Sequence, residues 1–304
     1  MAKRLSSCRV ETIIVDITEN NDFRVNVVSD LEPSSSGCVD DSLRELLAET
    51  GMLCLRMPRA LTDEEFKSMA ARFGPIKDPI ALTRDGTRIR YAPMRQDLES
   101  GRVVADGEMG ECSFGGLHAD RPLLFETFHC DDTYTRKPGW ASVLHARELP
   151  PSGGGPTCFI DMRAAYALLT RKTRETIDAL RVVYHYNNEG AFESRESSRG
   201  PNDVLEDVCH PLVRTHPIAG TRALFLDLDR AKHIVGLPKR RGRALLQSLQ
   251  DHAEARAPAC KHHWRPHDVL VWDNASVQHK ARGNFKVGEA RSFWRYLVAG
   301  GTPV

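Results

Sequence analysis

The chain of 304 residues is long enough to bury a sizeable core without disulfides or structural metals, in one large domain or two small ones. Its 42 Lys and Arg residues nearly balance its 41 Asp and Glu residues. The resulting net charge of +1 argues against a nucleic-acid-binding protein and against a polybasic membrane anchor. No run approaches about 18 apolar residues, and no apolar segment follows the first basic residues. We therefore expect no membrane span and no secretory signal, and we expect a cytoplasmic protein.

The first third of the chain begins weakly organised and then becomes helical. We expect residues 1–35 to form an N-terminal extension and residues 36–304 to form a single domain. Leu43, Leu46 and Leu47 have helical spacing, and the glycine at position 51 ends this predicted helix. The apolar run over residues 52–55 predicts a short strand.

A second helix is expected directly after Thr62. Thr62 is a favourable N-cap, and Glu65 stands three residues later, as in a capping box. Phe66, Met69, Ala70 and Phe73 then form one apolar face of the predicted helix, and a glycine at position 74 ends it.

The rest of the chain reads as many short strands. Residues 78–115 have no clear periodicity, so we expect a long loop that acts as an active-site lid. Helices are expected near 162–180 and 238–255. Short apolar runs separated by turns predict strands, at 140–144, 158–160, 182–184, 223–226, 269–272 and 293–298. These elements predict a mainly β protein with flanking helices.

Three H-x-[DE] triplets occur in the chain, beginning at His118, His129 and His252. On a strand, residues i and i+2 project from one face, so one imidazole and one carboxylate can bind the same metal. A further His completes the two-His, one-carboxylate set of non-haem iron oxygenases. Chance alone supplies some such triplets, so their context decides. His252 lies in a predicted amphipathic helix, whereas His129 follows a plausible strand over residues 123–128.

The context of His129 is a series of ordered motifs. They are Phe128-His129-Cys130-Asp131, then Ala146-Arg147-Glu148-Leu149-Pro150-Pro151, Gly154-Gly155-Pro156-Thr157, Asp161-Met162-Arg163-Ala164-Ala165-Tyr166, His210-Pro211-Leu212-Val213-Arg214-Thr215-His216-Pro217, Trp272-Asp273-Asn274, Gln278-His279, Arg291 and Arg295. Together with the early helix, this series resembles the taurine dioxygenase (TauD/TfdA-like) family of Fe(II)/2-oxoglutarate-dependent oxygenases, over roughly residues 40–300. One departure is His267, which stands where the family usually has Gly before Asp268.

The resemblance implies a double-stranded β-helix (jelly-roll, cupin-like) core and a set of functional residues. His129, Asp131 and His279 would bind Fe(II). Thr157 and Arg291 would bind 2-oxoglutarate, the Arg through a charge-assisted pair with the distal carboxylate. Arg295 would contact substrate, and His118 and Tyr91 are further candidates for substrate contacts.

The implied activity is a dioxygenase reaction that consumes O2 and 2-oxoglutarate. It would hydroxylate a C–H bond of a small substrate that is anionic or resembles an amino acid. A carboxylate at position 131 favours hydroxylation, desaturation or a related oxidation over halogenation, because related halogenases replace it with a small residue. A homo-oligomer is also an expectation from the family. Two alternatives remain: a zinc-dependent hydrolase on the same three ligands, and a non-catalytic jelly-roll binding module.

Overall fold

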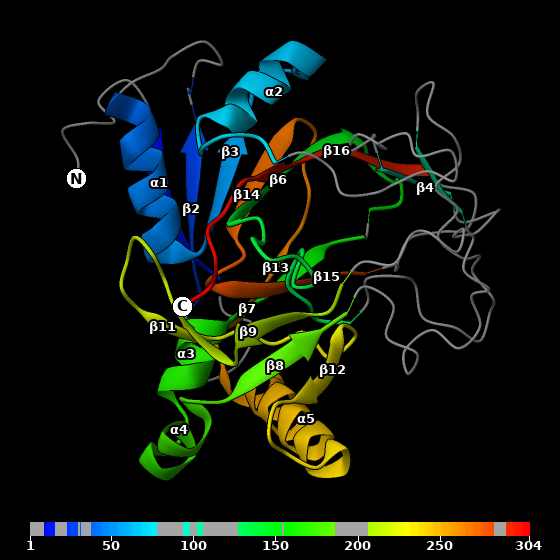
Figure 1. Cartoon of the computed structure of the whole chain (residues 1–304). Helices are drawn as coiled ribbons and strands as arrows, with labels where there is room; N and C mark the ends of the chain where they lie inside the picture. The colour runs from blue at the N-terminus through cyan, green and yellow to red at the C-terminus, as the bar shows by residue number, and fades with distance from the viewer. Residues whose placement is uncertain are drawn as a thin grey trace.

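The structure is a computed structural model. It describes residues 9–15, 23–29, 31, 38–77, 94–97, 102–105, 127–153, 155–185, 206–282 and 290–304. Strands form the middle of the protein, and helices lie toward its two ends (Figure 1). No helix in these ranges is long and apolar enough to cross a membrane.

The main sheet has eight strands in the order β1-β2-β3-β14-β6-β16-β4-β5. Their bounds are β1 (Arg9–Val15), β2 (Phe23–Ser29), β3 (Met52–Arg56), β14 (Asp268–Asp273), β6 (Ala141–Glu148), β16 (Ala290–Val298), β4 (Met94–Asp97) and β5 (Arg102–Ala105). All neighbours pair antiparallel except β2 and β3, which are parallel. Strand β14 is buried along its whole length, which explains its unbroken apolar run.

Two helices cover the outer face of the main sheet, α1 (Cys38–Thr50) and α2 (Asp63–Ala71). The predicted capping box is confirmed: Thr62 Oγ1 accepts from the Glu65 amide at 3.3 Å, and Glu65 Oε2 accepts from the Thr62 amide at 2.9 Å. The predicted apolar face of α2 packs against the sheet, with Phe66 and Phe73 fully buried. The predicted first helix ends before Gly51, whose φ of +80° favours glycine.

A three-stranded sheet, in the order β13-β7-β15, packs against the inner face of the main sheet. Its strands are β13 (Ala259–His262), β7 (Thr157–Asp161) and β15 (Val277–Ala281). Side chains from both sheets form one buried cluster, which includes Met52, Leu270, Trp272, Phe159, Cys260 and Val277. This space between the two sheets is where the functional side chains converge.

The remaining elements form a second layer below these sheets in Figure 1. They are β8 (Arg181–Tyr184), β9 (Val208–Pro211), β10 (Val213–Thr215), β11 (Arg222–Leu224), β12 (Ala231–Ile234), α3 (Met162–Ala167), α4 (Arg171–Ile177) and α5 (Lys239–Arg256). The single helix expected near 162–180 is two helices, because Thr170 caps a new one with a hydrogen bond to the Thr173 amide at 3.2 Å.

The fold class predicted from the sequence is confirmed: the protein is mainly β, with a jelly-roll core and flanking helices. The expected N-terminal extension differs from what is observed. Strands β1 and β2 come from residues 1–35, and β2 pairs with β3 inside the main sheet. Phe23 and Val28 are buried, so this segment supplies part of the core. Of the expected lid over residues 78–115, only β4 and β5 belong to the described part of the chain.

Candidate metal and cosubstrate site

Two imidazoles and one carboxylate meet between the two sheets. Potential ligand atoms of His129, Asp131 and His279 all lie within 4.8 Å of one another, and Asp131 and His279 are buried. The backbone brings the distant residues together, because the amide of each His donates to the carbonyl of the other at 3.0 Å. The sequence places His129 at the end of a strand, but among the described residues it forms an isolated bridge to β15.

The two rings are prepared for ligation in different ways. His129 Nδ1 lies 2.9 Å from the Thr127 carbonyl, which can only accept, so Nδ1 carries a proton and Nε2 carries the lone pair in the neutral ring. The His279 ring packs against Trp272, with ring centroids 4.6 Å apart. Burial lowers the pKa of His279 to about 3, so the ring is neutral near neutral pH.

Asp131 is a buried carboxylate with a donor on each oxygen. Ser142 Oγ donates to Oδ2 at 2.5 Å, and the Arg295 guanidinium lies 2.6 Å from Oδ1. Burial by itself would raise the pKa of Asp131. The positive charge of Arg295, together with the hydrogen bond from Ser142, outweighs that effect and holds the pKa of Asp131 well below its usual range. Two imidazoles and one ionised carboxylate are a donor set that fits Fe(II).

A hydrogen bond links Arg291 to the loop before Thr157; these are the two residues expected to bind 2-oxoglutarate. Arg291 Nε donates to the Gly155 carbonyl at 3.0 Å, two residues before Thr157. Thr157 Oγ1 accepts from Trp264 Nε1 at 3.1 Å. Arg291 is buried, and no carboxylate pairs with it among the described residues. Its surroundings therefore suit an incoming anionic group.

The turn that follows Asp131 is held by side-chain hydrogen bonds that sequence reasoning missed. Asp132 has a φ of +60°, and its carboxylate accepts from Lys77 Nζ at 2.6 Å. Thr133 donates to Asp227 Oδ2 at 2.9 Å. Asp227 is buried, and burial raises its pKa to about 6. No spacing rule links residues 77 and 227 to the H-x-D motif, because their contacts arise only in the folded chain.

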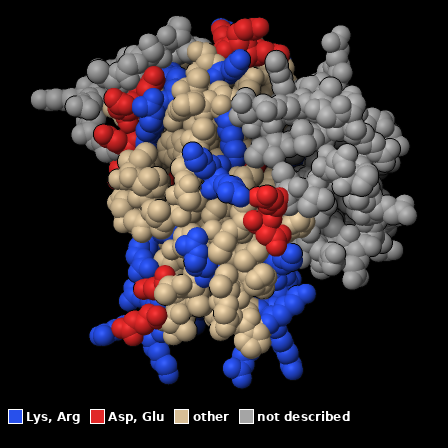
Figure 2. Space-filling model, viewed as in Figure 1, with Lys and Arg blue, Asp and Glu red and all other residues tan. Residues whose placement is uncertain are grey.

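Other residues singled out in the sequence lie elsewhere. Tyr91 and His118 fall outside the described residues. His252 lies in a helix as predicted, α5; it is half-buried, and its Nε2 lies 3.0 Å from the Ala165 carbonyl. The basic residues that begin α5 are exposed, and Figure 2 shows Lys and Arg side chains projecting from the end of the protein formed by α4 and α5.

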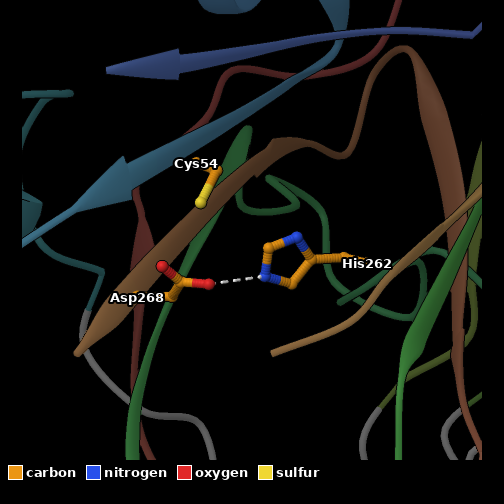
Figure 3. Close-up of side chains that lie close together, drawn as sticks. All are labelled: Cys54, His262 and Asp268. Carbon is orange, nitrogen blue, oxygen red and sulfur yellow. Dashed lines mark hydrogen bonds and ion pairs between the residues drawn. The ribbon is translucent and has the colours of Figure 1, made fainter. Parts of the chain in front are cut away.

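A second cluster resembles a metal site but is a hydrogen-bonded network. Cys54, His262 and Asp268 lie together, with the His262 ring turned toward Asp268 (Figure 3). Asp268 already accepts from His262 Nε2 at 3.1 Å, from Arg56 Nε at 3.2 Å and from the Arg265 amide at 3.0 Å. Burial raises the pKa of Cys54 to about 12, so the thiol keeps its proton. A cation here would have to displace Arg56, so we interpret the cluster as a link between β3, β13 and β14.

Comparisons with known proteins agree with this geometry. Residues 21–297 match the sequence model of the taurine catabolism dioxygenase TauD, TfdA family. An alpha-ketoglutarate-dependent 2,4-dichlorophenoxyacetate dioxygenase from Cupriavidus pinatubonensis is 30% identical, over 79% of this chain and 82% of that protein. An alpha-ketoglutarate-dependent sulfate ester dioxygenase from Pseudomonas putida is 26% identical, over 90% of this chain and 85% of that protein.

A solved structure extends the likeness to the fold. The crystal structure of a taurine dioxygenase from Burkholderia xenovorans superimposes with a TM-score of 0.71 at 24% identity, over 98% of this chain and 93% of that one. The zinc hydrolase and the non-catalytic binding module are therefore set aside. The chain belongs to the TauD/TfdA family of dioxygenases, which use Fe(II), 2-oxoglutarate and O2.

Proposed function

We propose that His129, Asp131 and His279 hold the iron of this dioxygenase, and that Thr157 and Arg291 hold the distal carboxylate of 2-oxoglutarate. The observation that carries the proposal is the convergence of the three ligand groups within 4.8 Å. The link from Arg291 to Gly155 supports the cosubstrate part, because it brings a buried cation to the loop that leads into Thr157.

The chain's own residues would then prepare and protect the reaction. The hydrogen bond from His129 to Thr127 orients one ligand ring, and Trp272 and Phe159 wall the other ring from solvent. When bound, the iron supplies activation of O2, coupled to oxidative decarboxylation of 2-oxoglutarate to succinate. The protein contributes positioning and exclusion of water.

We further propose that the substrate is a small organic anion and that the reaction hydroxylates one of its C–H bonds. Arg295 supports an anionic substrate, because it adds a permanent positive charge at the proposed metal site, where bound Fe(II) would share the negative charge of Asp131. Arg291 and Arg295 lie four residues apart on β16 and so share one face of that strand. Two relatives fit this inference, since 2,4-dichlorophenoxyacetate carries a carboxylate and a sulfate ester carries a sulfate group. The expected cytoplasmic location and homo-oligomer stay predictions.

The first experiment tests the metal and cosubstrate residues. Wild-type protein is titrated without oxygen with Fe(II) and 2-oxoglutarate, and the visible metal-to-ligand charge-transfer band is recorded. His279→Ala and Arg291→Ala should each lose the band at cosubstrate concentrations that saturate the wild type. His252→Ala removes a half-buried imidazole outside the site and should keep it. A full band in folded His279→Ala protein would refute the ligand assignment.

The second experiment tests the substrate class by succinate release. A panel pairs each aryl or alkyl carboxylate, sulfonate and sulfate ester with its neutral amide or alcohol. We expect succinate release that depends on the anionic member. At saturating Fe(II), which compensates for the loss of the Arg295 contact with Asp131, Arg295→Gln should raise the substrate KM by a larger factor than it lowers kcat. Equal stimulation by neutral and anionic members would contradict the proposed substrate class and leave the metal assignment untouched.

A further inference from the structure

A chain of buried hydrogen bonds runs from the tryptophan at the end of β14 to the carboxylate of Asp131. Trp272 Nε1 donates to Asn274 Oδ1 at 3.1 Å, and Asn274 Nδ2 donates to Ser142 Oγ at 2.9 Å. Ser142 Oγ then donates to Asp131 Oδ2 at 2.5 Å. The exposed fractions of Trp272, Asn274 and Ser142 are 2%, 1% and 0%, so water does not compete for these bonds.

The direction of every bond in this chain is forced by its two ends. An indole N–H can only donate and an ionised carboxylate can only accept. The Asn274 oxygen must therefore face Trp272, and its NH2 group must face Ser142 and the Gly139 carbonyl, which lies at 3.3 Å. Because Ser142 Oγ accepts a hydrogen bond from Asn274, the single hydroxyl proton of Ser142 is available to Asp131.

The chain restrains how the carboxylate can turn. Ser142 holds Oδ2 from β6, and Arg295 holds Oδ1 from β16. A donor on each oxygen opposes rotation about the Cβ–Cγ bond, and charge-assisted bonds in a buried setting are among the stronger ones. Oδ2 lies 3.8 Å from His279 Nε2, so Ser142 holds the oxygen that faces the second ligand.

Trp272 connects this chain to a second ligand. Its ring packs on His279 at a centroid distance of 4.6 Å, while its N–H begins the chain to Asp131. One side chain therefore contacts one proposed ligand and, through Asn274 and Ser142, orients another.

We propose that Ser142 and Asn274 are positioning residues that set the orientation of Asp131 for the metal. The proposal rests on the ligand role of Asp131 proposed above. Partners that orient metal ligands typically change metal affinity by about 10- to 100-fold when removed. Ser142→Ala removes the donor to Asp131. Asn274→Asp keeps the bond from Trp272 but removes the NH2 donor, so the Ser142 proton is drawn away from Asp131.

The test measures affinity for Mn(II), the probe metal, by the electron paramagnetic resonance signal of the free ion, together with thermal unfolding of the metal-free protein. Ser142→Ala and Asn274→Asp should each weaken Mn(II) binding by about 10- to 100-fold. The double variant should bind Mn(II) no more weakly than the weaker-binding of the two single variants, because both residues act on Asp131 through the same hydrogen-bond chain. Ser276→Ala is the matched control: it removes an equally buried hydroxyl, which donates to Asp273 and not to Asp131. It should lower stability without changing Mn(II) affinity.

Three outcomes would overturn the proposal. Wild-type affinity in Ser142→Ala, with binding lost in His279→Ala, would refute the positioning role and leave the ligand assignment standing. Equal weakening by Ser142→Ala and Ser276→Ala would show a structural effect only. Binding retained by His279→Ala would refute the ligand assignment on which the inference rests. If Ser142→Ala does not fold, Asn274→Asp decides alone.

Discussion

Replacing Arg291 by Met should separate cosubstrate binding from folding stability, because the two are expected to change in opposite directions. The Arg291 side chain is buried, and burial lowers its pKa to about 9. Within the described ranges, its compensating contacts are a hydrogen bond to Gly155 and the ring of Phe293, whose centroid lies 4.2 Å from the guanidinium carbon. A buried cation without a carboxylate partner opposes folding. Met is apolar and similar in length, so Arg291→Met should stabilise the ligand-free protein by about 1–2 kcal/mol.

The effect on 2-oxoglutarate follows from the lost charge-assisted bonds. Each is worth about 1.5–3 kcal/mol, so losing roughly 3 kcal/mol should weaken binding by about 100-fold. At a cosubstrate concentration about 100 times the wild-type Kd, binding should stabilise the wild type by about 2.7 kcal/mol and the variant by only about 0.4 kcal/mol. For a chain of 304 residues, with an unfolding entropy of about 0.64 kcal/mol/K, these values correspond to Tm shifts of about 4 °C and under about 1 °C.

The assay is thermal unfolding of Mn(II)-loaded protein with and without 2-oxoglutarate, with Arg291→Lys as the charge-retaining control. The Lys variant keeps the buried charge and loses the fork geometry, so it should show weaker binding without the gain in stability. An Arg291→Met protein that gains the full wild-type Tm shift would show that Arg291 does not bind the carboxylate. A ligand-free Arg291→Met protein less stable than the wild type would refute the argument from burial.

Three further predictions concern other parts of the protein. Metal titration should give one high-affinity divalent ion per chain, and this binding should be lost in His279→Ala and kept in Cys54→Ser. A second bound ion that is lost in Cys54→Ser would contradict our interpretation of the Cys54 cluster. Burial would raise the pKa of Asp268, but the hydrogen bond from His262 and its other donors hold it below the ordinary value of 3.8. The stability from this carboxylate is therefore present above about pH 4 and lost as the pH falls. In urea unfolding, Asp268→Asn should be less stable than the wild type at pH 7 and should lose less stability between pH 7 and pH 3. The same loss of stability in both proteins over this pH range would refute this prediction. His267 has a φ of +69°, where the family has glycine, so His267→Gly should raise the free energy of unfolding by about 0.5–1 kcal/mol; a loss of stability would show that the ring makes a compensating contact.

Features that depend on neighbouring residues could be predicted well. The capping box of α2 needs only Thr62, Glu65 and the geometry of one helical turn, and it forms as expected. The apolar runs became strands because β3, β14 and β6 are covered on both faces. The break near residue 168 was missed because the apolar residues before and after it continue a helical pattern.

The position of β2 could not be predicted from its own residues. Strand β2 pairs parallel with β3, and helix α1 connects the two strands in the sequence. The spacing of residues within β2 carries no information about which edge of a sheet this strand joins. The resemblance to a family began only after this strand, so residues 1–35 read as an extension. Phe23 and Val28 are buried, so residues of this segment contribute side chains to the core beside the main sheet.

The sequence by itself determined the donor types of the site and the family. His129, Asp131 and His279 could be proposed because the ordered motifs around them resemble those of the TauD/TfdA family, whereas the H-x-[DE] spacing alone does not distinguish His129 from His118 or His252. Only the tertiary structure decided how Asp131 is held. Ser142 on β6 and Arg295 on β16 each contact Asp131, and Asn274, which follows β14, donates to Ser142. The distances that set the direction of these hydrogen bonds exist only after those strands have paired. The same reason separates the proposed iron site from the Cys54 cluster. Both contain suitable ligand types, but only the fold shows that Arg56 already neutralises Asp268.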